Sequence, residues 1–270
     1  MLGKTVAFIF GSIVGSFLNV CIHRMPQNQS VVWPRSHCPN CKKRIPGYDN
    51  VPFLSFIALR GRCRYCREKI SLRYPFVELI TALAFALFFG QYALSYDFFV
   101  YTLFACLLII ATFIDIKQRI IPDEISIGGA ILGFIFSAIR GLNLNPLSFN
   151  FKPVFNSFLG IIVGGGIIWI TGALFDLVYF KLLKRPPIQG ETESMGGGDI
   201  KLLAMIGAFL GWRGALLTFF IAPFFGLIIG VINLLVKKDH TIPYGPFLAL
   251  AALLSIFWAN KIIELLLFTR

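Results

Sequence analysis

Long apolar stretches separated by short polar segments dominate the chain. Eight of them cover residues 5–21, 75–94, 98–116, 125–139, 154–180, 200–210, 215–236 and 247–268. A helix of about 20 residues crosses a hydrocarbon core of about 30 Å. The pattern therefore predicts an all-α polytopic membrane protein with about eight transmembrane helices. The stretch at 200–210 is short, since it rises only about 16 Å. Unless the helix continues through Trp212, Asp199 before it is expected to lie below the membrane surface.

The longest polar segment, residues 24–74, is strongly basic. Its 11 lysines and arginines face only Asp49 and Glu68. The positive-inside rule places this loop in the cytoplasm and the N-terminus outside. Alternating the eight stretches then puts 19 basic residues inside and 6 outside, in agreement with eight spans. We expect a first transmembrane helix at 1–23, the basic cytoplasmic loop at 24–74 and a transmembrane domain at 75–270.

Composition supports the membrane assignment. The chain is 57% hydrophobic and 14% charged, with a mean hydropathy of +0.76, whereas a soluble domain carries about a quarter charged residues. The net charge of +12 raises the alternative of a nucleic-acid binder. The basic residues gather in loops between apolar stretches, however, so we interpret the charge as topology and expect no nucleic-acid partner.

Four cysteines in the basic loop form two CxxC pairs. They are Cys38 with Cys41 and Cys63 with Cys66. This spacing is typical of a structural zinc site with four thiolate ligands and no open position for water. Two disulfides are the alternative, but a cytoplasmic loop is kept reduced. We therefore expect a small zinc-knuckle domain after the first helix.

Asp115 lies near the end of the apolar stretch at 98–116, where a carboxylate is costly. A structural ion pair with Lys117 or Arg119 is one explanation for it. By contrast, Asp123 begins the next stretch, where a helix cap and a favourable interaction with the helix dipole explain an acidic residue.

Asp199 follows the glycines Gly196, Gly197 and Gly198 and begins the stretch at 200–210. The glycines form either a simple flexible turn or a seat that lets an extended peptide approach closely. The topology puts Asp199 on the same membrane face as Asp115.

Two such carboxylates suit peptide hydrolysis, in which one activates water and the other donates a proton. Because close like charges share a proton, we hypothesise that Asp199, at a helix N-terminus, carries the charge and Asp115 the proton. A transporter or channel with a carboxylate ion path is the main alternative, although such sites usually lie near the midplane. A zinc-bearing assembly scaffold without activity is a third possibility.

Five segments together resemble the type IV prepilin leader peptidases, which are membrane aspartic proteases with a GxGD motif. The resemblance covers nearly the whole chain. The segments are GSFLNV at 15–20 with Arg24-Met25-Pro26 after it, the paired CxxC sequences, RYPFVEL at 73–79, the segment at 115–123 and GGGDIK at 196–201.

The resemblance implies that Asp115 and Asp199 are the catalytic pair, with Gly196, Gly197, Gly198 and Lys201 as candidate substrate-binding residues. The substrates would be prepilins and the pseudopilins of type II secretion, whose short basic leader is removed at the cytoplasmic face of the bacterial inner membrane. Many relatives also methylate the new N-terminus with S-adenosylmethionine. Gly15, Asn19 and Glu78 are candidates for that second activity, although helix packing is an alternative role for Gly15 and Asn19.

Overall fold

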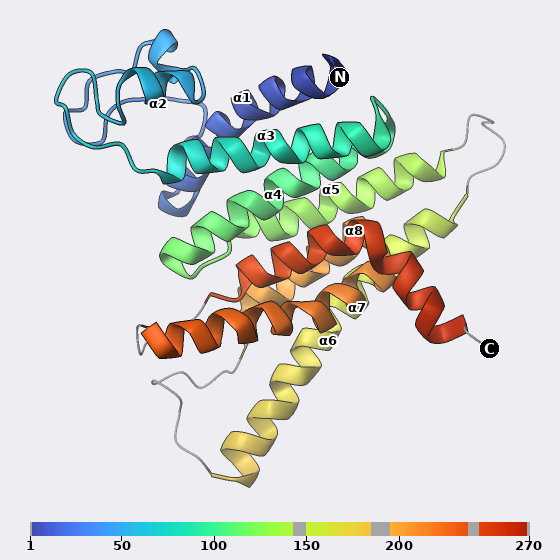
Figure 1. Cartoon of the computed structure of the whole chain (residues 1–270). Coiled ribbons are helices and arrows are strands. Elements are labelled where there is room, and N and C mark those ends of the chain that lie inside the picture. Colours follow the sequence, from blue (N-terminus) through green and yellow to red (C-terminus); the bar gives the residue numbers. More distant parts are fainter. Residues whose placement is uncertain (1, 143–149, 185–194, 237–242, 269–270) are drawn as a thin grey trace. The chain divides into compact units, whose positions relative to one another are not determined.

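A computed structural model describes residues 2–142, 150–184, 195–236 and 243–268 of this chain. Within those ranges the protein is helical and no β-strand forms (Figure 1), so the all-α prediction is confirmed. The helices are α1 Leu2–Arg24, α2 Leu54–Ala58, α3 Arg73–Tyr92, α4 Tyr96–Gln118, α5 Asp123–Gly141, α6 Lys152–Asp176, α7 Gly197–Val236 and α8 Gly245–Phe268.

The chain divides into two compact units, Met1–Ile114 and Asp115–Arg270. The first holds α1 to α3 and most of α4, and the second holds the last residues of α4 with α5 to α8. The predicted division at residues 23/24 and 74/75 stays a prediction.

Six described helices are long and apolar enough to cross a membrane, and the part of α8 at Gly245–Ala259 is a shorter apolar helix. The predicted count of eight spans is therefore approximate. The stretches at 200–210 and 215–236 form one element, α7, which Gly211 interrupts with φ 72° and ψ 179°. That conformation is almost restricted to glycine. The interruption divides a 40-residue element that would otherwise rise about 60 Å.

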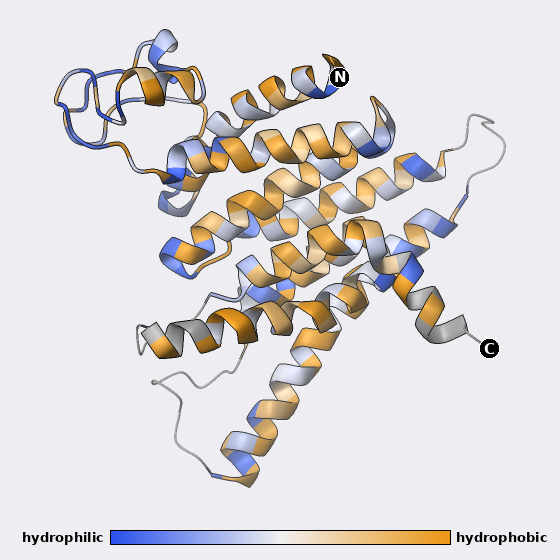
Figure 2. Cartoon of the chain, viewed as in Figure 1, coloured by the Kyte–Doolittle hydropathy of each residue, from blue (hydrophilic) through white to orange (hydrophobic). Residues whose placement is uncertain are grey.

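Large apolar side chains on the outer faces of these helices are exposed. Phe10 and Phe17 on α1 and Phe158 and Trp169 on α6 are at least half exposed. Figure 2 shows hydrophobic residues along the middle of the long helices, with hydrophilic residues near several helix ends. Water does not tolerate apolar faces of this extent, whereas lipid does. The chain is a multi-pass membrane protein.

Close helix contacts hold each unit together. In the second unit α6 packs on α7, and a Cβ on Gly160 would collide with the carbonyl of Gly207. In the first unit α1 packs along α3, where a Cβ on Gly15 would lie 2.7 Å from the Glu78 Cα. Small residues at these points let the backbones touch, which is how membrane helices associate without a hydrophobic driving force.

Candidate active site and metal centre

Asp115 lies in the last turn of α4 and is only 6% exposed. Its Oδ2 accepts a hydrogen bond of 2.9 Å from the backbone N–H of Gly245, the first residue of α8. Arg119 is near enough to act on the carboxylate electrostatically. Within the described residues, however, no ion pair joins Asp115 to Lys117 or Arg119. The partner of this buried carboxylate is therefore a helix N-terminus.

Asp199 occupies the first turn of α7 and is partly exposed. Its backbone N–H donates to the Gly196 carbonyl at 3.1 Å, which starts the helix. Asp199 and Asp115 lie within electrostatic reach of each other, although 84 positions separate them in the sequence. The structure thus brings together the two carboxylates that the sequence singled out.

Tyr244, just before α8, belongs to the same neighbourhood. Burial raises the pKa of its phenol to about 12, and the nearby Asp199 carboxylate adds to the effect. The phenol therefore keeps its proton at neutral pH and remains a hydrogen-bond donor. Sequence reasoning missed both Tyr244 and Gly245. The run Pro243-Tyr244-Gly245-Pro246 before the last apolar stretch was the available signal, since it carries strong turn residues.

The glycines before Asp199 leave its surroundings open. Gly197 and Gly198 are helical rather than part of a flexible turn, and Gly196 and Gly197 are exposed. A Cβ on Gly197 would meet nothing within 4 Å, and one on Gly196 would lie 3.5 Å from the Asp199 Oδ2. The backbone of these glycines, which carries no side chains, therefore borders the Asp199 carboxylate.

Lys201 pairs with the first residue of α5. Its Nζ lies 2.7 Å from the Asp123 Oδ1, and the two side chains are 44% and 57% exposed. Pro122 rather than Asp123 occupies the capping position of α5, and Asp123 lies in the first turn. The expected dipole interaction of Asp123 thus remains, whereas its expected capping role does not.

The four cysteines of the two CxxC sequences converge, and their sulfur atoms all lie within 4.8 Å of one another. The Sγ atoms of Cys38 and Cys66 are 3.8 Å apart. That is close to the edge of a tetrahedron built with Zn–S bonds of about 2.3 Å. All four are free thiols rather than disulfides. The donor set and its spacing fit a Cys₄ zinc site.

The two knuckles share one backbone geometry. The residue after each second cysteine, Lys42 or Arg67, has a φ of 59°. In the second knuckle the backbone amides of Cys66 and Tyr65 donate to the Cys63 sulfur and lower the pKa of its thiol to about 7. The thiolate that a metal requires is therefore accessible near neutral pH.

In the first knuckle the pKa of the Cys41 thiol is raised to about 11. The hydrogen bond from the Lys43 amide, which lowers it, is outweighed by desolvation and by hydrogen bonds to the other three sulfurs. A cation bound among the four sulfurs would favour the thiolate form of Cys41 and so oppose this rise.

Gly15, Asn19 and Glu78 meet where α1 packs on α3. The Asn19 Nδ2 donates to the Tyr74 carbonyl at 3.0 Å. The Glu78 Oε2 accepts from the backbone N–H of Phe53 at 3.1 Å, and Phe53 has a φ of 59°. These contacts join α1, α3 and the basic loop. They support the packing role for Gly15 and Asn19.

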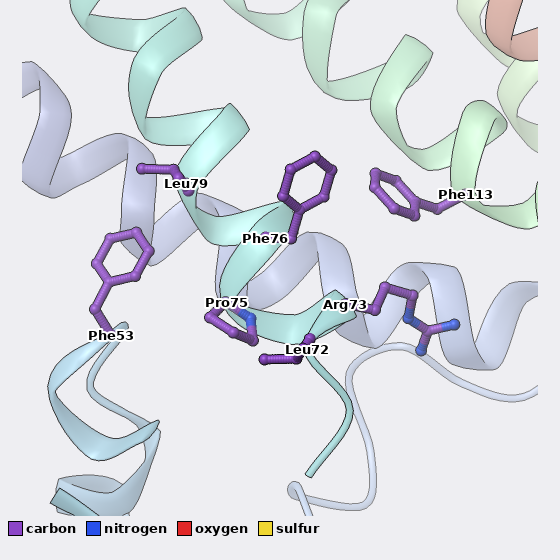
Figure 3. A pocket seen from close by; sticks show the side chains of 7 residues that line it. All are labelled: Phe53, Leu72, Arg73, Pro75, Phe76, Leu79 and Phe113. Carbon is purple, nitrogen blue, oxygen red and sulfur yellow. The ribbon is translucent and has the colours of Figure 1, made fainter. Parts of the chain in front are cut away.

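A pocket of about 520 Å³ opens in the first unit (Figure 3). Its lining residues are Phe53, Leu72, Arg73, Pro75, Phe76, Leu79 and Phe113. S-adenosylmethionine carries ribose hydroxyls, an amine and a carboxylate, which need several polar partners. Arg73 is the only charged residue in this lining, so the pocket suits an apolar side chain and does not fit the methyl donor.

The fold and the site place this protein in the class of helical membrane proteins in which two carboxylates from separate helices lie close together. Sequence comparison then gives the family. The model of the bacterial peptidase A24 N-terminal domain matches residues 9–92, and that of the type IV leader peptidase family matches residues 102–231. This chain belongs to the type IV leader peptidase family.

Its relatives include proteins named prepilin leader peptidase/N-methyltransferase. The one from Pseudomonas putida is 33% identical over 96% of this chain and 91% of its own length. The one from Neisseria gonorrhoeae is 31% identical over 94% and 90%, respectively. No solved structure matches the chain significantly.

Proposed function

We propose that this protein is a membrane aspartic endopeptidase that removes the leader of type IV prepilins and of type II secretion pseudopilins. The family and the names of its relatives indicate a prepilin peptidase that also has N-methyltransferase activity. The observation that carries the proposal is the meeting of Asp115 and Asp199, from different helices, within electrostatic reach. We place the active site at the cytoplasmic face of the bacterial inner membrane, with the N-terminus outside, and expect no nucleic-acid partner.

In this proposal the two carboxylates share one proton. The ionised member takes a proton from the attacking water, and the protonated member donates to the carbonyl oxygen of the scissile peptide. Asp115 is held by the Gly245 amide, whereas Asp199 is partly exposed beside glycine backbone. An extended leader would lie along Gly196, Gly197 and Gly198. The space beside Gly197 is open, whereas the Ile121 side chain lies against Gly198.

Lys201 forms the rim of the proposed substrate site together with Asp123. The resemblance implies that the leader is positively charged. The combined charge of Lys201 and Asp123 therefore determines whether this rim attracts or repels the leader. The apolar part of the substrate would lie among the membrane helices, whose outer faces are already apolar.

For the second activity we propose Glu78 as the residue that contributes to methyl transfer, with Gly15 and Asn19 holding α1 against α3. Glu78 is buried, and its Oε2 accepts a hydrogen bond from the Phe53 N–H of the basic loop. S-adenosylmethionine would supply the methyl group. Glu78→Gln should lower methylation of a pre-cleaved pilin peptide by about 100-fold, within the range of acid–base catalysis, and leave leader cleavage within twofold. A loss of both activities together would assign Glu78 to the fold.

The Cys₄ cluster is proposed to hold a structural Zn²⁺. Four thiolates would complete its coordination, so the metal would order the loop between Cys38 and Cys66 and take no part in hydrolysis.

Cleavage of a prepilin by the purified full-length protein tests the peptidase assignment. Asp115→Asn and Asp199→Asn should each lower kcat by about 100-fold or more, because each removes one proton-transfer group. Asp97→Asn, at the opposite end of α4 from Asp115, is the matched control and should cleave normally. Unchanged cleavage in both active-site variants would favour the transporter or channel instead.

A further inference from the structure

The first turn of α8 supports the proposed catalytic carboxylate. Asp115 and Gly245 are 130 positions apart, yet the Gly245 N–H donates to the Asp115 Oδ2 at 2.9 Å in a buried position. The N-terminus of a helix carries a partial positive charge and free N–H groups. Asp115 thus fills the role of a helix cap from another helix.

This turn offers Asp115 one donor. Gly245 is the first residue of α8, and Pro246, which follows it, has no N–H. The Phe247 N–H is already bonded to the Tyr244 carbonyl at 3.1 Å. The Gly245 amide is therefore the free backbone donor at the start of the turn, and it is aimed at one carboxylate oxygen.

The approach requires a residue without a side chain. A Cβ on Gly245 would lie 2.7 Å from the Asp115 Oδ2 and 3.2 Å from its Cγ. The first distance is shorter than any tolerated contact of this kind, so alanine would push the carboxylate away. The Gly245 backbone is not in the left-handed region, so space rather than conformation restricts the position.

We propose that Gly245 is a positioning residue for peptide hydrolysis. Its amide orients the Asp115 carboxylate, and the absence of a Cβ lets the two groups meet. Because Oδ2 is engaged in this hydrogen bond, Oδ1 is the oxygen that exchanges protons with water or substrate. The inference rests on the proposed role of Asp115. Tyr244, within electrostatic reach of Asp199, makes the same turn a neighbour of both carboxylates.

Kinetics of Gly245→Ala provide the first test. Misplacing a catalytic group by about 1 Å can cost about 100-fold in rate, so we expect kcat for prepilin cleavage to fall about 10- to 100-fold while KM stays within twofold. Methylation of a pre-cleaved peptide by the same variant should persist, because the candidate methyl-transfer residues lie in the other unit. Gly166→Ala, whose new Cβ meets nothing within 4 Å, is the control. An unchanged kcat, or equal loss of both activities, would overturn the inference.

Hydrogen exchange tests the same bond without any activity. The segment at 243–246 has only two backbone N–H groups, on Tyr244 and Gly245, because the other two residues are prolines. Asp115→Ala should speed exchange in a peptide covering this segment by about tenfold or more, whereas Asp199→Ala should not. Equal exchange in wild type and Asp115→Ala would overturn the inference. Full cleavage by Asp115→Asn would instead refute the peptidase assignment itself.

Discussion

The pair of Lys201 and Asp123 allows a test of what the substrate meets at the rim of the site. Both side chains are about half exposed. A basic leader is repelled by Lys201 and attracted by Asp123, so the lysine can act on binding chiefly by neutralising the aspartate. We predict that Lys201→Ala lowers the KM for a basic prepilin leader.

Exposure limits the size of the effect. A solvent-exposed charge pair is worth about 0.2–1 kcal/mol, and about 1.4 kcal/mol corresponds to a tenfold change. The KM should therefore fall by about 1.4- to fivefold at low salt. The kcat should stay within twofold, since neither residue is proposed to touch the reacting atoms. At 1 M salt, where the screening length is about 3 Å, the difference should vanish.

Steady-state cleavage of a synthetic prepilin peptide in detergent measures both constants. Asp123→Asn should raise KM. Adding Lys201→Ala to it should lower KM by less than Lys201→Ala does alone, because no aspartate is left to unmask and only the direct repulsion by Lys201 is removed. Lys181→Ala, which removes an exposed positive charge elsewhere on the second unit, is the charge-matched control. A higher KM in Lys201→Ala would refute the shielding argument and assign Lys201 to direct contact with the substrate.

Two further predictions concern the metal and the interrupted helix. The zinc affinity of the full-length protein, measured by competition with a chelator, should fall at least about tenfold from pH 8 to pH 6. Protons compete with the metal for the thiolates in this range, because the pKa of Cys63 is about 7. A pH-independent affinity would exclude thiolate ligands. Gly211→Ala should destabilise the protein by about 1–3 kcal/mol in detergent unfolding, since its φ of 72° with ψ of 179° suits only glycine. Gly166→Ala, in a helical position with open space, should not destabilise it, and equal effects of the two changes would contradict the strain at Gly211.

The sequence predicted the features that local patterns carry. Apolar run length gave the helical membrane class, because a helix in lipid must satisfy its own backbone. CxxC spacing gave the thiol cluster, since a knuckle brings its two sulfurs together by local geometry alone. From the lengths of the apolar stretches we predicted residues 200–210 and 215–236 to be separate transmembrane spans. The structure makes them one element interrupted at Gly211, and a glycine between two apolar runs does not by itself distinguish a loop from a break.

The charge assignment within the aspartate pair shows why the rest of the site was inaccessible from sequence. The hypothesis that Asp199 carries the charge rested on the dipole of the helix that Asp199 begins. The structure gives Asp115 the N-terminus of α8, through a contact across 130 positions that no local pattern encodes. Both carboxylates therefore lie at helix N-termini, so the dipole no longer distinguishes them. The shared proton then belongs to the pair, and a pH–rate profile would report two apparent constants for the dyad rather than one for each residue.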